Sequence, residues 1–221
     1  MISKNPILNF FQTRQFTIKL LFVIFYSVGV AGMLLPATAE YFLQLIPFAL
    51  YLSFTVLAHS DESEKRRKLV LYLLFVYVTS FLIEVAGVQS GTIFGTYSYG
   101  NNLGVKLWGT PLIIGANWFF LVYTTAAIFE KVRIKPAFKV LLASGAMLVY
   151  DMVMEQVAPK LNMWDWKHPS VPFQNYFMWF LMAIAFHIGL QRLKIKVQNK
   201  LALTVLLCQF LFFVFLFIFM D

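Results

Sequence analysis

The chain has 221 residues, of which 60% are hydrophobic and 13% are charged. A soluble domain carries about 25% charged residues and could not hide so much apolar surface, so the composition excludes a soluble protein. The single cysteine excludes an internal disulfide and a thiolate metal cluster.

Seven segments are apolar and long enough to cross a membrane, which requires about 20 mostly apolar residues. In chain order they lie near residues 17–35, 40–58, 68–88, 110–130, 136–156, 173–191 and 200–220. The stretch before them, residues 6–16, mixes apolar side chains with Arg14 and is expected to lie along the membrane interface. The sequence therefore predicts an all-α, polytopic helix bundle of about seven spans, with residues 1–221 forming one integral membrane domain.

The basic residues predict the orientation of this bundle. Of the 18 lysines and arginines, all but Lys106, Lys160 and Lys167 fall at one end, beginning with Lys4 and Arg14. Short cytoplasmic loops carry the Lys and Arg excess of membrane proteins. We therefore expect a bacterial or archaeal cytoplasmic membrane protein with its N-terminus inside and its C-terminus outside. Its net charge of +8 would contact lipid headgroups, not nucleic acid.

Three of the ten carboxylates fall within predicted spans: Glu84, Asp151 and Glu155. An ionisable side chain inside a membrane is costly and indicates a functional site. Asp151 and Glu155 are four residues apart and share one helix face. Three amides are expected at a similar depth toward the outer side, and these are Asn117, Gln174 and Asn175. The structural alternative is that such groups reach toward water or join helices, and for Asn117 both interpretations stay open.

Six aromatic residues are expected near the same level: Trp118, Tyr123, Trp164, Trp166, Tyr176 and Trp179. Aromatic residues usually fill lipid-facing and interfacial positions, but their ring faces can also stabilise a cation. His187 is expected in the inner half of its helix as an ordinary buried histidine.

Several classes of membrane protein conflict with these residues. A retinal protein needs a lysine in the last span for its Schiff base, and residues 201–220 contain none. The three histidines do not cluster on one helix, so no metal site is expected. The DMVME sequence at residues 151–155 is similar to the aspartate-rich motif of membrane prenyltransferases, but it occurs once and has few basic neighbours.

Two blocks of sequence resemble a known family. The first block contains the motif E-x2-G-x3-G-x2-FG-x-Y-x-Y, which starts at Glu84. The second contains W-x-W at Trp164 and Trp166, followed by QNY at residues 174–176 and WF at residues 179–180. Together they cover about 100 residues of the chain, counted from the printed sequence with the joining stretches. They resemble the membrane carotenoid-biosynthesis hydratases.

The resemblance implies a reaction and a substrate. Members of this family are similar in adding water across the terminal C1=C2 double bond of an acyclic carotenoid end group. No cofactor is implied, because the reaction leaves the electron count unchanged. The implied partners are a lipophilic polyene, membrane lipids and other carotenoid enzymes.

We assign residue roles as hypotheses. A proton must reach C2 from a neutral carboxylic acid, and burial among other carboxylates favours the neutral form. Asp151 is the predicted acid, and Glu84 holds it or acts as the base toward water. Water is oriented by Glu155, Asn117 and Asn175, and the predicted substrate contacts include Gln174 and Tyr176. The ring faces of Trp118, Trp164 and Trp166 would shield the cation.

Two alternative functions stay open at this point. A lycopene-type cyclase begins with the same proton transfer, but a second double bond captures the cation in place of water. A membrane transporter or assembly protein would use the carboxylates as a proton relay. Transporters usually show repeated halves and broken helices, and the sequence shows neither feature.

Overall fold

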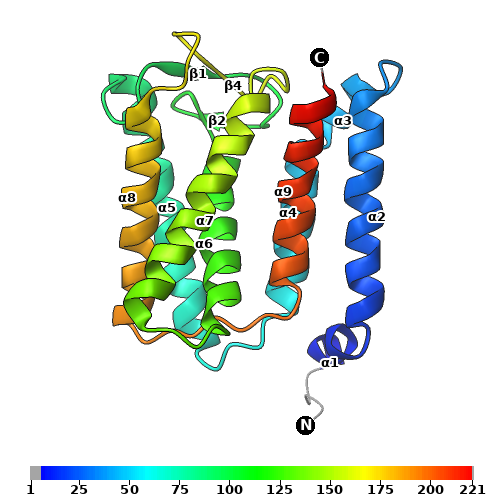
Figure 1. Ribbon diagram of the computed structural model, residues 1–221, viewed down its shortest axis with the longest axis vertical. Helices are drawn as coiled ribbons and strands as arrows, with labels where there is room; N and C mark the ends of the chain where they lie inside the picture. The colour runs from blue at the N-terminus through cyan, green and yellow to red at the C-terminus, as the bar shows by residue number, and fades with distance from the viewer. Residues whose placement is uncertain (1–5, 221) are drawn as a thin grey trace.

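The computed structural model describes residues 6–220; residues 1–5, with the predicted inner Lys4, and residue 221 lie outside that range. Figure 1 shows a bundle of upright helices, with strands and long loops gathered at its upper end. The elements, in chain order, are α1 (Pro6–Thr13), α2 (Gln15–Leu34), α3 (Ala39–Gln44), α4 (Ile46–His59), α5 (Arg66–Ser90), β1 (Tyr97–Tyr99), β2 (Lys106–Leu107), β3 (Thr110–Pro111), α6 (Ile113–Glu130), α7 (Pro136–Val157), β4 (Trp164–Trp166), α8 (Phe173–Arg192) and α9 (Ala202–Phe219). The predicted all-α polytopic architecture is confirmed.

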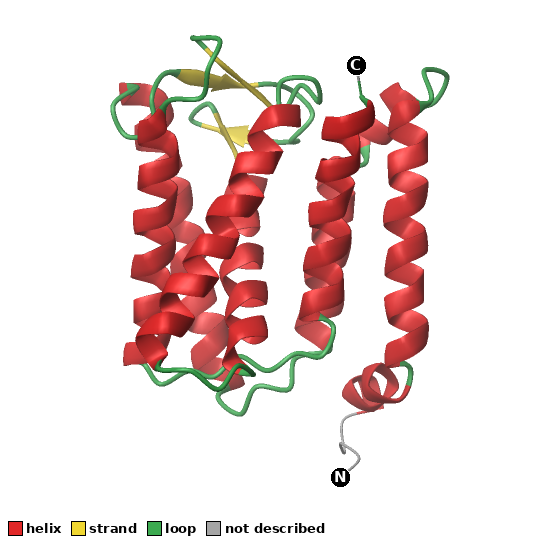
Figure 2. Cartoon of the chain, viewed as in Figure 1, coloured by secondary structure: helices red, strands yellow, loops and turns green. Residues whose placement is uncertain are grey.

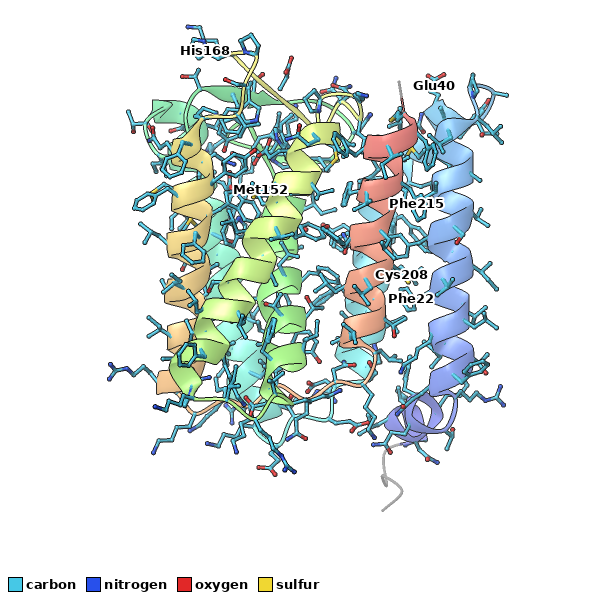
Figure 3. The ribbon with its side chains drawn as sticks, in the orientation of Figure 1. Phe22, Glu40, Met152, His168, Cys208 and Phe215 are labelled. Carbon is cyan, nitrogen blue, oxygen red and sulfur yellow. The ribbon has the colours of Figure 1, made fainter. Side chains whose placement is uncertain are left out.

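Among the described residues, six helices are long and apolar enough to cross a membrane: α2, α5, α6, α7, α8 and α9. The central helix is α6, which packs against α4, α5, α7, α8 and α9. Its side chains Trp118, Phe120 and Leu121 are almost fully buried. By contrast, α9 exposes Phe215, labelled in Figure 3, and Phe217 on its outer face, as expected for a helix that faces lipid.

The prediction that residues 40–58 form a single spanning helix was wrong. The chain forms α3 and α4 there, separated at Leu45. Pro47 lies in the first turn of α4, and a proline ring clashes with the preceding turn of a continuous helix. With 14 residues, α4 is about 21 Å long, shorter than the apolar core of about 30 Å. It is therefore a seventh, short apolar helix beside the six longer ones.

Two other expectations near the helix ends also differ. The fourth span begins at Ile113 and not at residue 110, because Thr110 and Pro111 pair with β2 as a short strand. The N-terminal stretch forms α1, which Figure 1 shows almost end-on beside the upright α2. A helix that runs across the bundle at its lower end is consistent with the predicted interfacial position.

The two long loops at the upper end meet in a two-stranded antiparallel sheet. β1 pairs with β4 in the register Tyr97 to Trp166, Ser98 to Asp165 and Tyr99 to Trp164. Figure 2 shows this sheet, in yellow, covering the helix ends. Gly91 ends α5 with a φ of 64°, which a glycine adopts at no steric cost, and so turns the chain toward β1.

The three turns that contain most of the basic residues lie at the opposite, lower end in Figure 1. These turns join α4 to α5, α6 to α7 and α8 to α9. The predicted separation of basic residues between the two ends therefore agrees with the fold, while the side of the membrane that each end faces stays a prediction.

Candidate active site

Glu84 lies in the last two turns of α5 and is 3% exposed. Its Oε2 atom accepts hydrogen bonds from the hydroxyls of Tyr97 at 2.6 Å and Tyr99 at 3.0 Å. Its Oε1 atom accepts a hydrogen bond from Nε1 of Trp118 at 3.3 Å. A buried carboxyl is stable only when its oxygens are satisfied in this way, so the three donors hold Glu84 in one orientation.

Asp151 and Glu155 lie one turn apart on α7 and face α8, as their spacing predicts. Nδ2 of Asn175 donates to Oδ2 of Asp151 and to Oε1 of Glu155, both at 3.2 Å. Nε1 of Trp164 and Nε1 of Trp166 donate to Oε2 of Glu155, at 2.9 Å and 2.7 Å. Oδ1 of Asp151 is buried and has no hydrogen-bond partner among the described residues.

The β1–β4 sheet explains why four aromatic donors reach the same site. Alternate residues of a strand point to opposite faces of a sheet. Tyr97 and Tyr99 on β1, and Trp164 and Trp166 on β4, therefore point down into the bundle, while Ser98 and Asp165 point up. The tyrosines bind Glu84 on α5 and the tryptophans bind Glu155 on α7. The sheet thus joins the two carboxylates and closes the upper end of the bundle.

The two carboxylates Glu84 and Glu155 line a common cavity of about 20 Å³. A cavity of roughly 10–15 Å³ by this measure can hold one water molecule when polar partners are present. The other polar side chains in its wall include Asn117 and Asn175. The site is therefore the right size and polarity for a single bound water between two carboxyl groups.

A second cavity of about 310 Å³ adjoins the first. Its wall is almost entirely apolar and comes mainly from α2, α4, α6, α7 and α9. The two cavities share four lining residues, Ile114, Asn117, Met154 and Trp164. Apolar cavities of this size are typical of small-molecule sites in proteins.

Glu155 and Trp166 also line a groove on the upper surface, with Tyr176 and His168 in its wall. His168 is labelled at the top of Figure 3. Glu155 and Trp166 line the water-sized cavity as well. Glu155 is therefore the carboxyl group that lies between the outer groove and the buried site.

The two tyrosine hydroxyls remain donors over a wide pH range. Burial, and after it the neighbouring Glu84, raises the pKa of Tyr97 above the ordinary phenol value. The same two causes raise the pKa of Tyr99. Both hydroxyls therefore stay protonated at neutral and moderately alkaline pH and continue to bind Glu84.

The structure brings most of the predicted site residues together. Trp118 donates a hydrogen bond to Glu84, while Asn175, Trp164 and Trp166 donate to the pair Asp151 and Glu155, so the predicted residues form two adjacent hydrogen-bonded groups. Asn117 lies between the two cavities, and its side chain makes no hydrogen bond to any described residue. Tyr176 lies on the rim of the outer groove.

Other expectations differ from the structure. Gln174 is exposed and donates to the backbone carbonyls of Thr92 and Ile93, so it fastens α8 to a loop instead of facing either cavity. Asp151 lines neither of the two buried cavities. The tryptophans direct their N–H edges at carboxylates, and the ring of Trp118 stacks on Trp179 at 4.0 Å. The hypothesis that they shield a cation with free ring faces therefore gains no support for Trp118.

No role was predicted for Tyr97 and Tyr99, although both stand in the motif that starts at Glu84. The signal was the alternation of Y-x-Y and W-x-W in the two outer loops. Alternation of this kind predicts strands with one aromatic face. Pairing the two strands would have placed all four aromatic side chains on the same side.

The fold and the site together define a polytopic membrane protein with a buried acidic pocket beside an apolar cavity. The chain belongs to the carotenoid biosynthesis protein family, whose model matches residues 39–221. It is also 28% identical over 147 residues to the bisanhydrobacterioruberin hydratase of Haloarcula japonica, an alignment that covers 58% of this chain and 47% of the relative. The chain thus spans about half the length of this curated relative. No solved structure is significantly similar to this chain.

Proposed function

We propose that the protein hydrates the terminal C1=C2 double bond of an acyclic carotenoid end group, giving a tertiary 1-hydroxy end group. The observation that carries this proposal is the contact between the two cavities. An apolar space suited to an isoprenoid end adjoins a polar space suited to one water, and two carboxyl groups line the polar space. The family match supports a part in carotenoid biosynthesis, and the similar protein of Haloarcula japonica is named as a hydratase.

In this proposal the polyene dissolves in the bilayer and its end enters the 310 Å³ cavity from the lipid side. The wall at Asn117 and Trp164 would set the terminal double bond against the carboxyl groups. The apolar cavity excludes bulk water, so the cation that forms is exposed only to the water held in the small cavity.

We assign the proton donor to Glu155 and not to Asp151, because only Glu155 lines the small cavity. Asp151, four residues away, is its positioning partner, since two adjacent buried carboxyls do not ionise together and so retain one proton between them. Asn175 holds both in place. After each turnover, Glu155 regains its proton from the outer groove, which it also lines.

Glu84 is the base in the proposed mechanism. It accepts three hydrogen bonds, and a carboxylate with several donors is stabilised as the anion. The proton of Glu155 passes to C2 and leaves a tertiary cation at C1. The bound water forms the C1–O bond and gives one proton to Glu84. Glu84 then releases that proton through the small cavity toward the outer groove, which balances the proton that Glu155 takes up. Both carboxyl groups are restored, one water is added, and no electron is gained or lost.

The orientation of the site belongs to the same proposal. We propose that the end with the carboxylates faces the extracytoplasmic side, since the basic turns lie at the other end and basic loops stay in the cytoplasm. The outer groove would then draw water and protons from outside the cell.

Product analysis tests the proposed function. The chain would be expressed in a lycopene-producing host, the carotenoids would be separated by chromatography, and their masses would be measured by mass spectrometry. Hydration adds the mass of one water per modified end, whereas cyclisation leaves the mass unchanged. A pigment profile identical to that of the empty host, or products of unchanged mass, would count against the proposal.

A further inference from the structure

A second acidic site lies at the lower end of the bundle, away from the carboxylates described above. Asp61, in the turn between α4 and α5, is 5% exposed. Its Oδ1 atom accepts hydrogen bonds from Ser63 at 2.7 Å and Tyr123 at 2.8 Å. Tyr123, which the sequence placed among the outer aromatics, thus belongs to this site instead. Oδ2 of Asp61 is buried without a hydrogen-bond partner among the described residues.

Asp61 lines an apolar cavity of about 230 Å³ between α4, α5 and α6. Val70 and Leu74 line the same cavity and are 48% and 52% exposed, so it opens sideways toward lipid. The cavity is deep as well as open, because Leu57, Leu69 and Phe120 in its wall are almost fully buried. An acyl chain can therefore enter from the bilayer and lie against apolar side chains.

The polar end of this cavity contains both signs of charge. Arg66 lines it beside Asp61, and Nη2 of Arg66 donates to the carbonyl of Ala58 at 2.9 Å. No ion pair joins Arg66 to Asp61 among the described residues. The guanidinium has five N–H donors, so most of them remain free for a ligand. The carboxylate offers an acceptor and the guanidinium offers donors within one pocket.

From these features we infer that the cavity is a binding site for a phospholipid with a primary ammonium headgroup. The acyl chain would occupy the apolar space, the phosphate would bind Arg66, and the ammonium would donate to the free oxygen of Asp61. A buried carboxylate oxygen without a donor is costly, and a headgroup N–H removes that cost. Arginine suits the phosphate because its planar fork matches phosphate oxygens.

Headgroup chemistry provides the test. Phosphatidylethanolamine has ammonium N–H donors, and phosphatidylcholine has the same phosphate but no such donor. The full chain would be reconstituted in nanodiscs that contain equal amounts of both lipids, and retained lipids would be counted by native mass spectrometry. We expect about ten-fold preferential retention of phosphatidylethanolamine, the size of one hydrogen bond to a buried charge.

Two variants separate the two contacts. Asp61→Asn leaves an acceptor for Ser63 and Tyr123 but turns the free oxygen into a donor, so the preference for ethanolamine should disappear. Arg66→Gln should reduce the retention of both lipids. Glu62→Gln is the matched control, because Glu62 pairs with Lys200 at 3.2 Å and lies outside the cavity wall, and it should change neither lipid.

Equal retention of both lipids by the unaltered chain would overturn the inference, as would an Asp61→Asn protein that keeps the preference. If Asp61→Asn does not fold, two measurements still test the inference: lipid retention by Arg66→Gln, whose altered residue is exposed, and cross-linking by a phospholipid with a photoreactive acyl chain. That chain should cross-link to Leu74 or Phe120, and cross-linking elsewhere, or displacement of the lipid by carotenoid, contradicts the inference. The result is independent of any catalytic activity.

Discussion

Tyr97 lies directly opposite Trp166 in the β1–β4 ladder, with ring centroids 4.9 Å apart, yet the two side chains bind different carboxylates. Tyr97 donates to Glu84 on α5, and Trp166 donates to Glu155 on α7. One pair of residues in a three-residue ladder therefore sets the separation of the proposed base and the proposed acid.

Removing the Tyr97 hydroxyl should impair catalysis without unfolding the bundle. Tyr97→Phe deletes the 2.6 Å hydrogen bond to Glu84 and keeps the ring against Trp166. Hydrogen bonds to charged groups contribute about 1.5–3 kcal/mol, so we expect hydrated product to fall about ten-fold or more. Tyr41→Phe is the control and should keep most of the activity, because Tyr41 is exposed and lines neither the two cavities nor the outer groove. Product yield at matched protein level, by chromatography, gives the answer.

The two carboxyls of α7 should differ in their importance. Glu155→Gln removes the proposed proton donor from the small cavity, and general acid catalysis contributes about 10²–10⁴-fold. Asp151→Asn leaves the donor in place and alters only its neighbour, so the loss should be smaller. A larger loss in Asp151→Asn than in Glu155→Gln, measured as initial rates in reconstituted vesicles, would return the donor role to Asp151.

We expect Asn117 to determine whether water or a second double bond captures the cation. Asn117 lies between the apolar cavity and the water-sized cavity, with no hydrogen bond to another described side chain. Asn117→Leu keeps a similar volume but removes the polar group that holds water. We expect the hydrated product to fall about ten-fold, as for loss of one hydrogen bond to a reacting group, and cyclic products of unchanged mass to appear. An unchanged ratio of hydrated to cyclic product would show that Asn117 does not hold the water.

Alkaline pH should destabilise the closed upper end of the bundle. The pKa values of Tyr97 and Tyr99 are raised above their ordinary value of about 10 in the folded protein. Above about pH 10 the folded state therefore binds more protons than the unfolded state. The stability that the two tyrosines contribute is fully present below about pH 10 and falls as the pH rises further. Thermal unfolding measured across alkaline pH should show this fall, and the double variant Tyr97→Phe, Tyr99→Phe should show a weaker pH dependence. If the unfolding temperature fell equally steeply with pH in the unaltered protein and the double variant, the two tyrosines would not be the source of the pH dependence.

Much of this architecture follows from composition and spacing. The spans at residues 68–88, 136–156 and 173–191 agree with α5, α7 and α8 to within a few residues. Apolar length alone is a strong signal in a membrane, because the backbone must form its own hydrogen bonds there. The same signal failed at residues 40–58, where Pro47 interrupts an apolar run that is otherwise long enough.

The site was only partly predictable. The cost of burying charge singled out Glu84, Asp151 and Glu155, and helix periodicity placed the last two on one face. Two of the three donors to Glu84, Tyr97 and Tyr99, lie on β1, and their positions depend on a pairing with residues of β4 almost 70 positions away, counted from the printed sequence. Hydropathy contains no information on such a pairing. Gln174 was grouped with its neighbour Asn175, but successive helix residues point in different directions.

In the proposed mechanism, water enters the product at this acidic pocket. The most direct test incubates the reconstituted protein with an acyclic carotenoid in water labelled with heavy oxygen, and follows label in the product by mass spectrometry. We expect one labelled oxygen per hydrated end in the unaltered protein, and a loss of about 10²-fold or more in both Glu84→Gln and Glu155→Gln. Undiminished incorporation of label by either variant would contradict the proposed mechanism.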